Sequence, residues 1–344
     1  MTNDNPLKRI LAVRGMGQVL TAAAGLLIMC VVFSYVNPSF ASGRNLANLL
    51  RQIVPILLVG IAQSYVLITG NIDLSIGSVL GMSCMISATL MSGGMHPLAA
   101  VALTMAAALA IGWLNGALVS RCRLPPFIAT LGTMIIARGI AQLVNGNRNT
   151  DSIRKMVPAD VVYSAQDAFR DIFYLGKTFG IHNCVWLTLL IFTFFAFLLS
   201  KTRTGRHIYA VGSNIEAARL SGVDTARTVT VAYVVSAFCA GTAGLYTTAL
   251  SGMGAMDAGN MYELYAVAAA VIGGVSTLGG QGILLGTVFG ASIWCVLKNG
   301  LQFAGVSVAY QNIVIGVIVI VSVLLDVIVR TDMLKGKFKK KTTS

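Results

Sequence analysis

Charged residues are scarce in this sequence of 344 residues. Only 11% are Asp, Glu, Lys or Arg, whereas 56% are hydrophobic and the mean hydropathy is +0.78. A soluble domain carries about 25% charged residues, so this composition excludes a soluble globular protein and indicates a chain that crosses a membrane several times. The formal net charge of +13 comes from cations in loops and near the C-terminus, which favours contact with anionic lipid over binding to nucleic acid.

The residue spacings that hold metals, disulfides or nucleotides are also missing. The six cysteines stand singly, without a CxxC pair, and the three histidines are far apart in the sequence, which favours neither a metal site nor structural disulfides. Gly176-Lys177-Thr178 ends like a phosphate-binding loop, but Asp171 stands where the required earlier glycine belongs. No nucleophile–base set marks an enzyme active site. We therefore expect neither catalysis nor a cofactor in this chain.

Ten apolar runs approach the length of about 20 residues that a helix needs to cross a bilayer. We therefore predict an all-α polytopic membrane protein with about ten transmembrane helices. The first run is longer than the core of a signal peptide and lacks a clear cleavage site, so we interpret it as a retained span. The predicted spans are Gly17–Val36, Ile53–Thr69, Gly77–Ser92, Pro97–Val119, Phe127–Val144, Cys184–Ser200, Thr228–Leu250, Glu263–Gly274, Ile283–Lys298 and Tyr310–Val329.

The distribution of Lys and Arg predicts that both chain ends lie in the cytoplasm. Cytoplasmic loops are enriched in these residues, and most of them fall in the two tails and the loop 201–227. We divide the chain into a cytoplasmic tail at 1–16, one transmembrane domain at 17–329 and a basic cytoplasmic tail at 330–344. Residues 145–183 form the one sizeable external loop, which is either simply solvated or a landing surface for an extracytoplasmic partner.

Two glycine-rich stretches, Gly70–Ser78 and Gly273–Gly282, interrupt the apolar pattern without a long polar loop. Non-helical backbone at membrane depth is tolerated only where protein or a water-filled cavity satisfies its polar groups, and in transporters such broken or re-entrant segments line the substrate path. Asp73 or Ser75 can cap the helix that follows; alternatively, Asp73 acts in the path, because ionisable groups in a membrane are costly. The candidate pathway residues are Asn71, Asp73, Ser75, Glu263 and Ser276.

The polar stretch Thr202–Arg227 opens with cations and is predicted to lie in the cytoplasm. A short helix is predicted over Ile215–Leu220, with Ser213 or Asn214 as its N-cap and Gly222 as its C-terminal stop. The stretch is either a solvated turn or a docking surface for another protein. A second short helix is possible in the external loop, within the stretch 161–173.

Small and aromatic residues suggest how the spans pack. Glycines four residues apart let helix backbones approach closely in lipid, and we expect this packing within one subunit, with packing between two subunits as the alternative. Tyr262, Tyr265 and Trp294 are either aromatic site residues or part of an interface or the core. The glycine spacings occur at Gly77/Gly81, Gly112/Gly116 and Gly282/Gly286/Gly290.

Several segments resemble the permeases of ABC importers, and in particular those of the ribose/galactose type. Glu216-Ala217-Ala218 followed by Gly222 resembles the EAA…G coupling segment, which fits into a cleft on the ATPase subunit. The similarity continues in consistent order from about residue 45 to 329. The matching stretches are 205–223, the G-x-x-DLS-x-GS segment at 70–78, the PFI-x-TLG segment at 126–132, the YEL…GG block at 262–280 and the stretch 300–311.

The resemblance implies a permease subunit of the bacterial cytoplasmic (inner) membrane that works as a pair, with a second copy or a paralogue. It implies a cytoplasmic ABC ATPase that binds ATP and Mg²⁺, and a periplasmic or lipoprotein sugar-binding protein. The implied cargo is a monosaccharide (pentose or hexose) or a related polyol. The residues that the resemblance assigns to ATPase coupling are Gly205, Asn214, Glu216, Ala217, Ala218 and Gly222.

The chain departs from the family pattern at two positions. Asn71 stands where many relatives carry glycine, and Tyr265 where an acidic residue is common, so the sugar stays open, as does the choice between homodimer and heterodimer. The alternative function is an ion-coupled secondary transporter of a small polar solute, which would need several carboxylates buried in spans. A channel would need a repeated polar ring along a pore, and the sequence contains none.

Overall fold

In the described residues, the regular secondary structure of the computed structural model is helical apart from one short hairpin. In this hairpin, β1 (Lys177–Thr178) pairs antiparallel with β2 (Ile181–His182), and Lys177 lies opposite His182. All but one residue of the predicted 1–16 tail, and the whole 330–344 tail, lie outside the described residues. The structure describes residues 16–158, 160–314, 316–318, 320–321, 323–324 and 328.

Seven helices in the described part are long and apolar enough to cross a membrane, which confirms the all-α polytopic class. They are α2 (Met16–Val36), α3 (Gly43–Ile68), α5 (Pro97–Ser120), α6 (Pro126–Leu143), α8 (Asn183–Lys201), α11 (Thr225–Ser251) and α13 (Leu284–Phe303). Two other predicted spans correspond to shorter apolar helices, α4 (Ile76–Ser92) and α12 (Tyr262–Ile272). The last predicted span overlaps the apolar helix Val308–Ile318, and much of the rest of that span lies outside the described residues. Ten complete passes therefore stay a prediction.

Two helices differ from the predicted spans. Helix α3 begins at Gly43, well before the predicted Ile53, because Ser42 caps it by accepting a hydrogen bond from the Asn45 amide at 3.3 Å. The Asn45 side chain is buried and donates to the Asn299 amide oxygen at 2.9 Å. Polar residues in these first turns thus contact protein and extend the helix beyond the apolar run. Helix α13 continues past its predicted end to Phe303.

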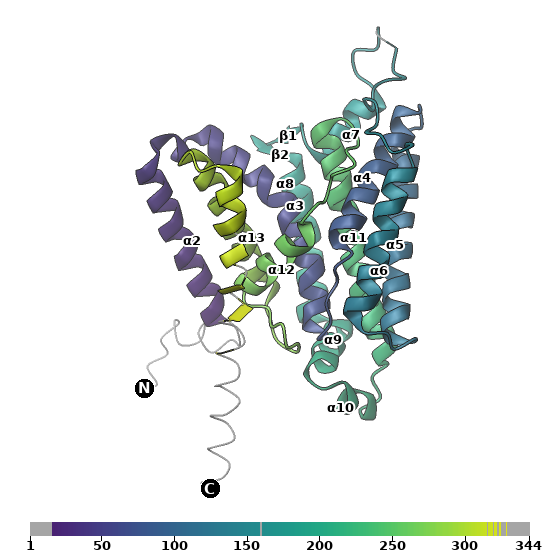
Figure 1. The fold of residues 1–344 in the computed structure, drawn as a ribbon, viewed down its shortest axis with the longest axis vertical. Helices are drawn as coiled ribbons and strands as arrows, with labels where there is room; N and C mark the ends of the chain where they lie inside the picture. The colour runs from purple at the N-terminus through teal and green to yellow at the C-terminus, as the bar shows by residue number, and fades with distance from the viewer. Residues whose placement is uncertain are drawn as a thin grey trace.

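The core is built around α3 and α11. Both are largely buried, whereas α2 is largely exposed although it is the more apolar helix, as expected where lipid rather than water surrounds the protein. In Figure 1, α2 and α13 stand side by side at one edge and α5 and α6 at the other, with α3, α12 and α11 between them. The figure also separates an α10 end at the bottom from an α7 end at the top, and these two names are used below.

The glycine spacings serve packing within the subunit. A side chain at Gly112 or Gly116 would collide with α11 near Tyr233 and Thr230, so α5 and α11 lie in close contact. Gly286 likewise lies against Gly273. These contacts confirm the first interpretation of the GxxxG motifs for the described part of the chain.

Two helices connect α8 with α11 at the α10 end. Helix α10 (Ile215–Leu220) has the predicted bounds, and the Asn214 side-chain oxygen caps it by accepting from the Ala217 amide at 2.9 Å. The preceding helix α9 (Arg203–Ser213) was not predicted. It forms because the Thr202 hydroxyl caps it, accepting from the Gly205 amide at 3.3 Å.

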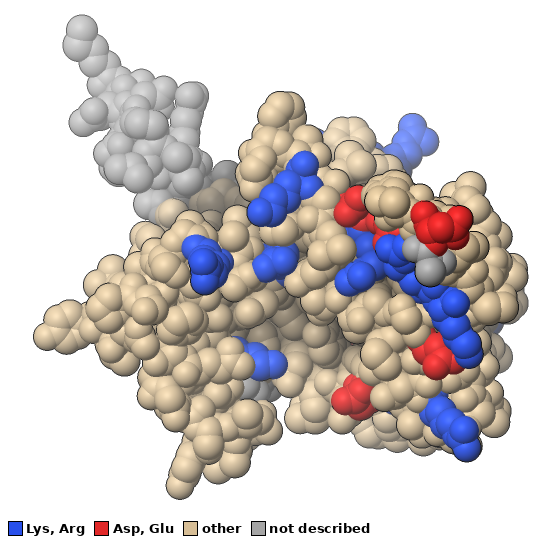
Figure 2. Space-filling view, turned by 90° about the horizontal axis from the view of Figure 1, so that it is seen from above, with Lys and Arg blue, Asp and Glu red and all other residues tan. Residues whose placement is uncertain are grey.

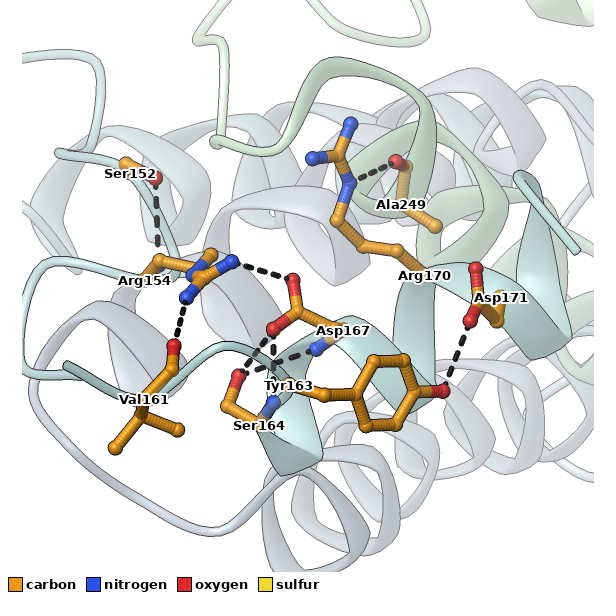
Figure 3. A network of polar contacts seen from close by, with 9 residues as sticks. All are labelled: Ser152, Arg154, Val161, Tyr163, Ser164, Asp167, Arg170, Asp171 and Ala249. Carbon is orange, nitrogen blue, oxygen red and sulfur yellow. Dashed lines mark hydrogen bonds and ion pairs between the residues drawn. The ribbon is translucent and has the colours of Figure 1, made fainter. Parts of the chain in front are cut away.

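At the opposite end, α7 (Ala165–Phe173) occupies only part of the stretch predicted to be helical. Ser164 and Asp167 form a reciprocal capping box that fixes its start. Figure 3 shows the surrounding network, in which Arg154 forms an ion pair with Asp167 at 3.1 Å. The Arg170 side chain donates to the Ala249 carbonyl at 3.0 Å and so attaches α7 to α11.

Candidate functional site

Helix α10 is largely exposed and is attached to the rest of the protein through one buried side chain, Ala218. Ala218 is buried with Val66, Val211, Val229 and Tyr233, so it attaches α10 to α3, α9 and α11. The other side chains of this helix face outward: Leu220 is 86% exposed and Ile215 is 50% exposed.

The polar residues of α10 stabilise the helix itself. Glu216 and Arg219 are both exposed and form an ion pair at 2.6 Å. The helix ends at Gly222, whose positive φ of 80° is the left-handed conformation that glycine adopts most easily. The structure thus places five of the six predicted coupling residues, from Asn214 to Gly222, on one small exposed unit, whereas Gly205 is buried at the start of α9.

The end of α9 contacts the end of α3, which precedes the first break, and the second break itself. Gly212 lies so close to the Ile68 carbonyl and to Gly280 that a side-chain carbon at position 212 would overlap backbone atoms of both. The Gly280 amide in turn donates to the Ile68 carbonyl at 2.9 Å, and the Tyr209 hydroxyl donates to the Gly282 carbonyl at 2.7 Å. We call this contact of α9, the end of α3 and the second break the glycine junction.

The first break is held by a buried hydrogen-bond network around Asp73. The Asp73 side chain, which belongs to a residue only 2% exposed, accepts from the Ser75 amide at 2.9 Å and from the Ser75 hydroxyl at 2.6 Å. Its second oxygen accepts from the Ser236 hydroxyl of α11 at 2.7 Å. Ser75 occupies the N-cap position of α4 but makes no capping bond with its own side chain. Asp73 therefore fixes the turn that leads into α4.

The network continues into α5 and α6. The Asn115 amide donates to the Ser75 hydroxyl at 2.9 Å, and the Thr133 hydroxyl donates to the Asn115 carbonyl oxygen at 2.6 Å. The Tyr233 hydroxyl donates to the backbone oxygen of Ile72 at 3.0 Å. Our sequence analysis missed these partners. The sequence marks them only as polar residues within apolar spans. Such residues are common wherever helices pack in membranes, so they do not reveal their partners.

The starts of α4 and α12 meet near the middle of the molecule. The Asp73–Ser236 bond places the start of α4 beside the central part of α11. A side chain at Gly77 would overlap the carboxylate of Glu263, in the first turn of α12. In transporters, positively polarised N-termini of interrupted helices are typical of substrate sites.

The five candidate pathway residues therefore fall into two places. Asp73, Ser75 and Glu263 lie near this meeting point of α4 and α12. Asn71 and Ser276 lie in the break segments toward the glycine junction: the Asn71 amide donates to the Thr69 hydroxyl at 2.8 Å, and the Ser276 hydroxyl accepts from the Leu278 amide at 3.1 Å. Asp73 and Ser276 are buried, whereas Glu263 is half-buried.

A cavity of about 360 Å³ lies between α3, α11, α12 and α13. Tyr262, Tyr265 and Trp294 line it as one aromatic cluster, with ring centroids 5.4 Å apart between the tyrosines and 4.8 Å apart between Tyr265 and Trp294. Lys298 lies over the Tyr265 ring at 5.9 Å, and Gln52 adds an amide. An aromatic wall with a few polar groups is typical of pockets for small organic ligands.

These features define the protein as a polytopic helical membrane protein in which an exposed surface unit is connected to two broken helices. Residues 45–323 match the family described as the permease component of the branched-chain amino acid transport system. The chain belongs to this family of membrane permeases. As a permease component it is a transport subunit that contains no ATPase domain of its own and sits in the bacterial cytoplasmic membrane as a multi-pass protein.

The curated relatives are import permeases. The ribose import permease of Bacillus subtilis strain 168 is 36% identical over 91% of this chain and 94% of its own length. The D-allose transport system permease of Escherichia coli K12 is 35% identical, over 88% of this chain and 89% of its own. The galactose/methyl galactoside import permease of Salmonella typhimurium strain LT2 is 33% identical, over 88% and 91%. No solved structure matches the chain.

Proposed function

We propose that this chain is the permease subunit of an ATP-driven ABC importer for a monosaccharide, a pentose or hexose, or a related polyol. The observation that carries the proposal is the continuous contact from the exposed α10 through α9 to the end of α3 and to the second break. Such an arrangement suits a transporter that receives mechanical work from another protein. The names of the relatives, which import ribose, allose and galactose, support the cargo class.

The orientation that we propose places α10 and both termini in the cytoplasm, with ten passes. The α10 end carries the cations of the loop 201–227, and cytoplasmic loops are enriched in Lys and Arg. The α7 end then faces the outside and receives the sugar-binding protein on α7 and its neighbouring loop. Figure 2 shows this face, which is hollowed near its centre and carries basic side chains around the hollow.

The coupling mechanism follows from the contacts of α10. When two copies of the permease, or this chain and a paralogue, bind their ATPases, closure of the ATPases on ATP moves α10. The side chains of Leu220 and Glu216 supply its contact surface, and the buried Ala218 transmits the movement to α9. Because the backbone at Gly212 lies directly against the backbone of Ile68 and Gly280, a shift of α9 displaces the end of α3 and the second break together.

The sugar path that we propose runs from the α7 end through the aromatic cavity to the meeting point of α4 and α12. In the cavity, Tyr265 and Trp294 offer ring faces to the sugar and Gln52 offers an amide donor and acceptor. Glu263 adds a carboxylate at the meeting point of α4 and α12. Asn71, Asp73, Ser75 and Ser276 line or position the break segments beyond it. The path gives only weak selectivity, and the external binding protein selects the sugar.

The experiment that tests this function is uptake by the reconstituted complex. Proteoliposomes that contain this chain, its ATPase and its binding protein are supplied with labelled ribose, allose or galactose, with and without internal ATP. We expect uptake of at least one sugar that needs both ATP and the binding protein and that persists after an ionophore abolishes ion gradients. Uptake that collapses with the ionophore while ATP remains would instead establish an ion-coupled secondary transporter.

A further inference from the structure

A groove runs between α5, α8 and α11, outside the α10 helix, the two breaks and the aromatic cavity. It consists of two adjoining hollows of about 480 Å³ each, which share Val234 and Val235 of α11. Because they share these two residues, the hollows form one continuous groove along the side of the molecule. The two halves differ in chemistry, and this difference indicates the occupant.

The half nearer the middle of the molecule is entirely apolar. Its walls are aliphatic and aromatic side chains from three helices, including Leu109, Leu190 and Phe238. Phe194 is 58% exposed and Leu190 is 68% exposed at its rim, whereas Phe195 closes its floor and is only 6% exposed. The width between three helices and the absence of polar walls suit a hydrocarbon chain.

The half at the α10 end is cationic. Arg121 follows the last residue of α5 and Arg227 lies in the first turn of α11, and both line the hollow with exposed side chains. In the part of the chain that the structure describes, neither guanidinium has an ion-pair partner. Asp224 also lines this hollow, but its carboxylate accepts from the Arg227 backbone amide at 2.9 Å and so caps α11.

Along the helix axes, the arginines lie at one end of the groove and the apolar walls lie toward the other. On α11 the lining proceeds from Arg227 through Val234 to Phe238, and on α5 it proceeds from Arg121 to Leu109. The two helices run antiparallel in close contact, so both arginines lie at the same depth and both apolar stretches lie together. Trp113 of α5 also lines the cationic half and is 54% exposed.

We propose that this groove binds one anionic phospholipid. The phosphate lies between Arg121 and Arg227, whose guanidinium groups match phosphate geometry, and one acyl chain lies along the apolar half against Phe194 and Phe238. The lipid thereby contacts the first turn of α11, which directly follows the α10 unit. The inference concerns the membrane partner of this face and does not depend on which solute the protein transports.

The test measures which lipid stays bound to the purified chain. The full chain is reconstituted in vesicles of phosphatidylglycerol and phosphatidylcholine in equal parts, extracted in a mild detergent and analysed by native mass spectrometry. We expect wild-type protein to retain more phosphatidylglycerol than phosphatidylcholine. In the Arg121→Gln/Arg227→Gln double variant, the ratio of retained phosphatidylglycerol to phosphatidylcholine should be roughly tenfold lower. Arg123→Gln is the matched control, because Arg123 is exposed nearby but does not line the groove.

A second variant tests the acyl-chain half independently. Leu190→Trp fills the rim of the apolar hollow at an exposed position and leaves both arginines in place, so retained phosphatidylglycerol should fall as well. Gel filtration and melting temperature establish that each variant is folded; if the double variant does not fold, Leu190→Trp decides. The proposal is overturned if either folded variant retains phosphatidylglycerol like wild type, or if wild type retains both lipids equally.

Two further outcomes would assign the groove to another occupant. Displacement of the lipid by millimolar inorganic phosphate would indicate a site for a free anion. Crosslinking between two copies of a Phe194→Cys variant would indicate that a second copy of the chain covers the apolar half. Neither should occur if a phospholipid occupies the groove.

Discussion

At the residue scale, the break segments depend on one glycine and one carboxylate. Gly212 permits backbone contact between α9, the end of α3 and the second break. Asp73 supplies three of the acceptor contacts that hold the first break. Gly212 cannot take a side chain, because backbone atoms lie against it. Asp73 cannot lose its carboxylate without leaving its buried hydrogen-bond donors unpaired.

Gly212→Ala should separate α9 from the helix breaks. The added carbon would overlap the Ile68 carbonyl and the Gly280 amide, and relief of such overpacking costs about 1–3 kcal/mol. We expect a lower melting temperature and reduced sugar uptake per ATP hydrolysed by the complex. Gly139→Ala is the control, since nothing lies within 4 Å of that position; equal behaviour of the two variants would contradict the glycine junction.

Asp73→Ala should destabilise the protein more than Asp73→Asn. Alanine leaves the Ser75 amide and the Ser236 hydroxyl buried without their acceptor, at a cost of about 1–3 kcal/mol for each unsatisfied group. Asparagine keeps one acceptor oxygen, and its amide can donate to Ser236. Thermal unfolding in detergent measures the difference, with exposed Asp257→Ala as the control; if Asp73→Ala melts like wild type, the network does not hold the break.

At the scale of the element, α10 and α7 are short helices that depend on their caps rather than on length. Helix α10 has only six residues, far below the length at which a helix is stable alone in water. Its stop at Gly222 and its N-cap at Asn214 therefore decide whether the proposed coupling surface forms. Helix α7 depends in the same way on the capping box of Ser164 and Asp167.

Gly222→Val should uncouple transport. A β-branched residue at a φ of 80° is strained by about 1–2 kcal/mol, so the end of α10 should unwind. We expect weaker binding of the ATPase and loss of sugar uptake, measured by pull-down and by uptake in proteoliposomes. Gly222→Asn is the matched control, because asparagine tolerates this conformation, and it should retain most activity.

Glu216→Lys changes the charge of the α10 surface and removes its ion pair with Arg219. It should weaken ATPase binding while the melting temperature stays close to wild type, because exposed ion pairs contribute about 0–1 kcal/mol. Full ATP-driven uptake by this variant would argue against docking through α10.

The stability of α7 should fall in acid. Partial desolvation acts to raise the pKa of Asp167, but hydrogen bonds from Ser164 and the positive charge of Arg154 outweigh it, and the pKa lies below its ordinary value of 3.8. A lowered pKa in the folded state means that the stabilisation is complete above the unfolded pKa and is lost as the pH falls through the folded one. Hydrogen exchange of the α7 amides, expressed relative to the intrinsic exchange rate at each pH, should accordingly stay slow from about pH 6 down to the ordinary pKa and accelerate below it.

The control for this prediction replaces the carboxylate itself. Asp167→Asn should show faster α7 exchange already at neutral pH and little further change in acid, whereas Asp160→Asn, at an exposed position, should behave like wild type. A wild-type profile without acceleration below pH 3.8 would show that the capping box does not stabilise α7 through its charge.

At the scale of the whole molecule, the orientation in the membrane can be tested with a native residue. Cys122 is exposed, while the other five cysteines are buried or half-buried, and it follows α5 at the α10 end. A membrane-impermeant thiol reagent should label it only in inside-out vesicles. Val162→Cys, at a position 93% exposed at the α7 end, should be labelled in intact cells. Labelling of Cys122 from outside would overturn the proposed orientation.

The sequence alone determined the class of the protein and its local signals. Apolar runs, caps and glycine stops are encoded by neighbouring residues, so the apolar helices and the bounds of α10 followed from composition and spacing, whereas the early start of α3 did not. The two breaks were recognisable for the same reason, because glycines interrupt otherwise apolar runs.

Only the tertiary structure decided which of these segments touch. The pairing of Asp73 with Ser236, the contact of Gly212 with Ile68, and the groove between Arg121 and Arg227 join residues that are far apart in the chain. Nothing local distinguishes a serine that binds a carboxylate from one that bonds to its own helix, since either satisfies the hydroxyl. Which choice is made depends on how α3, α5 and α11 pack, and this packing is set by the complementary shape of all three helices at once.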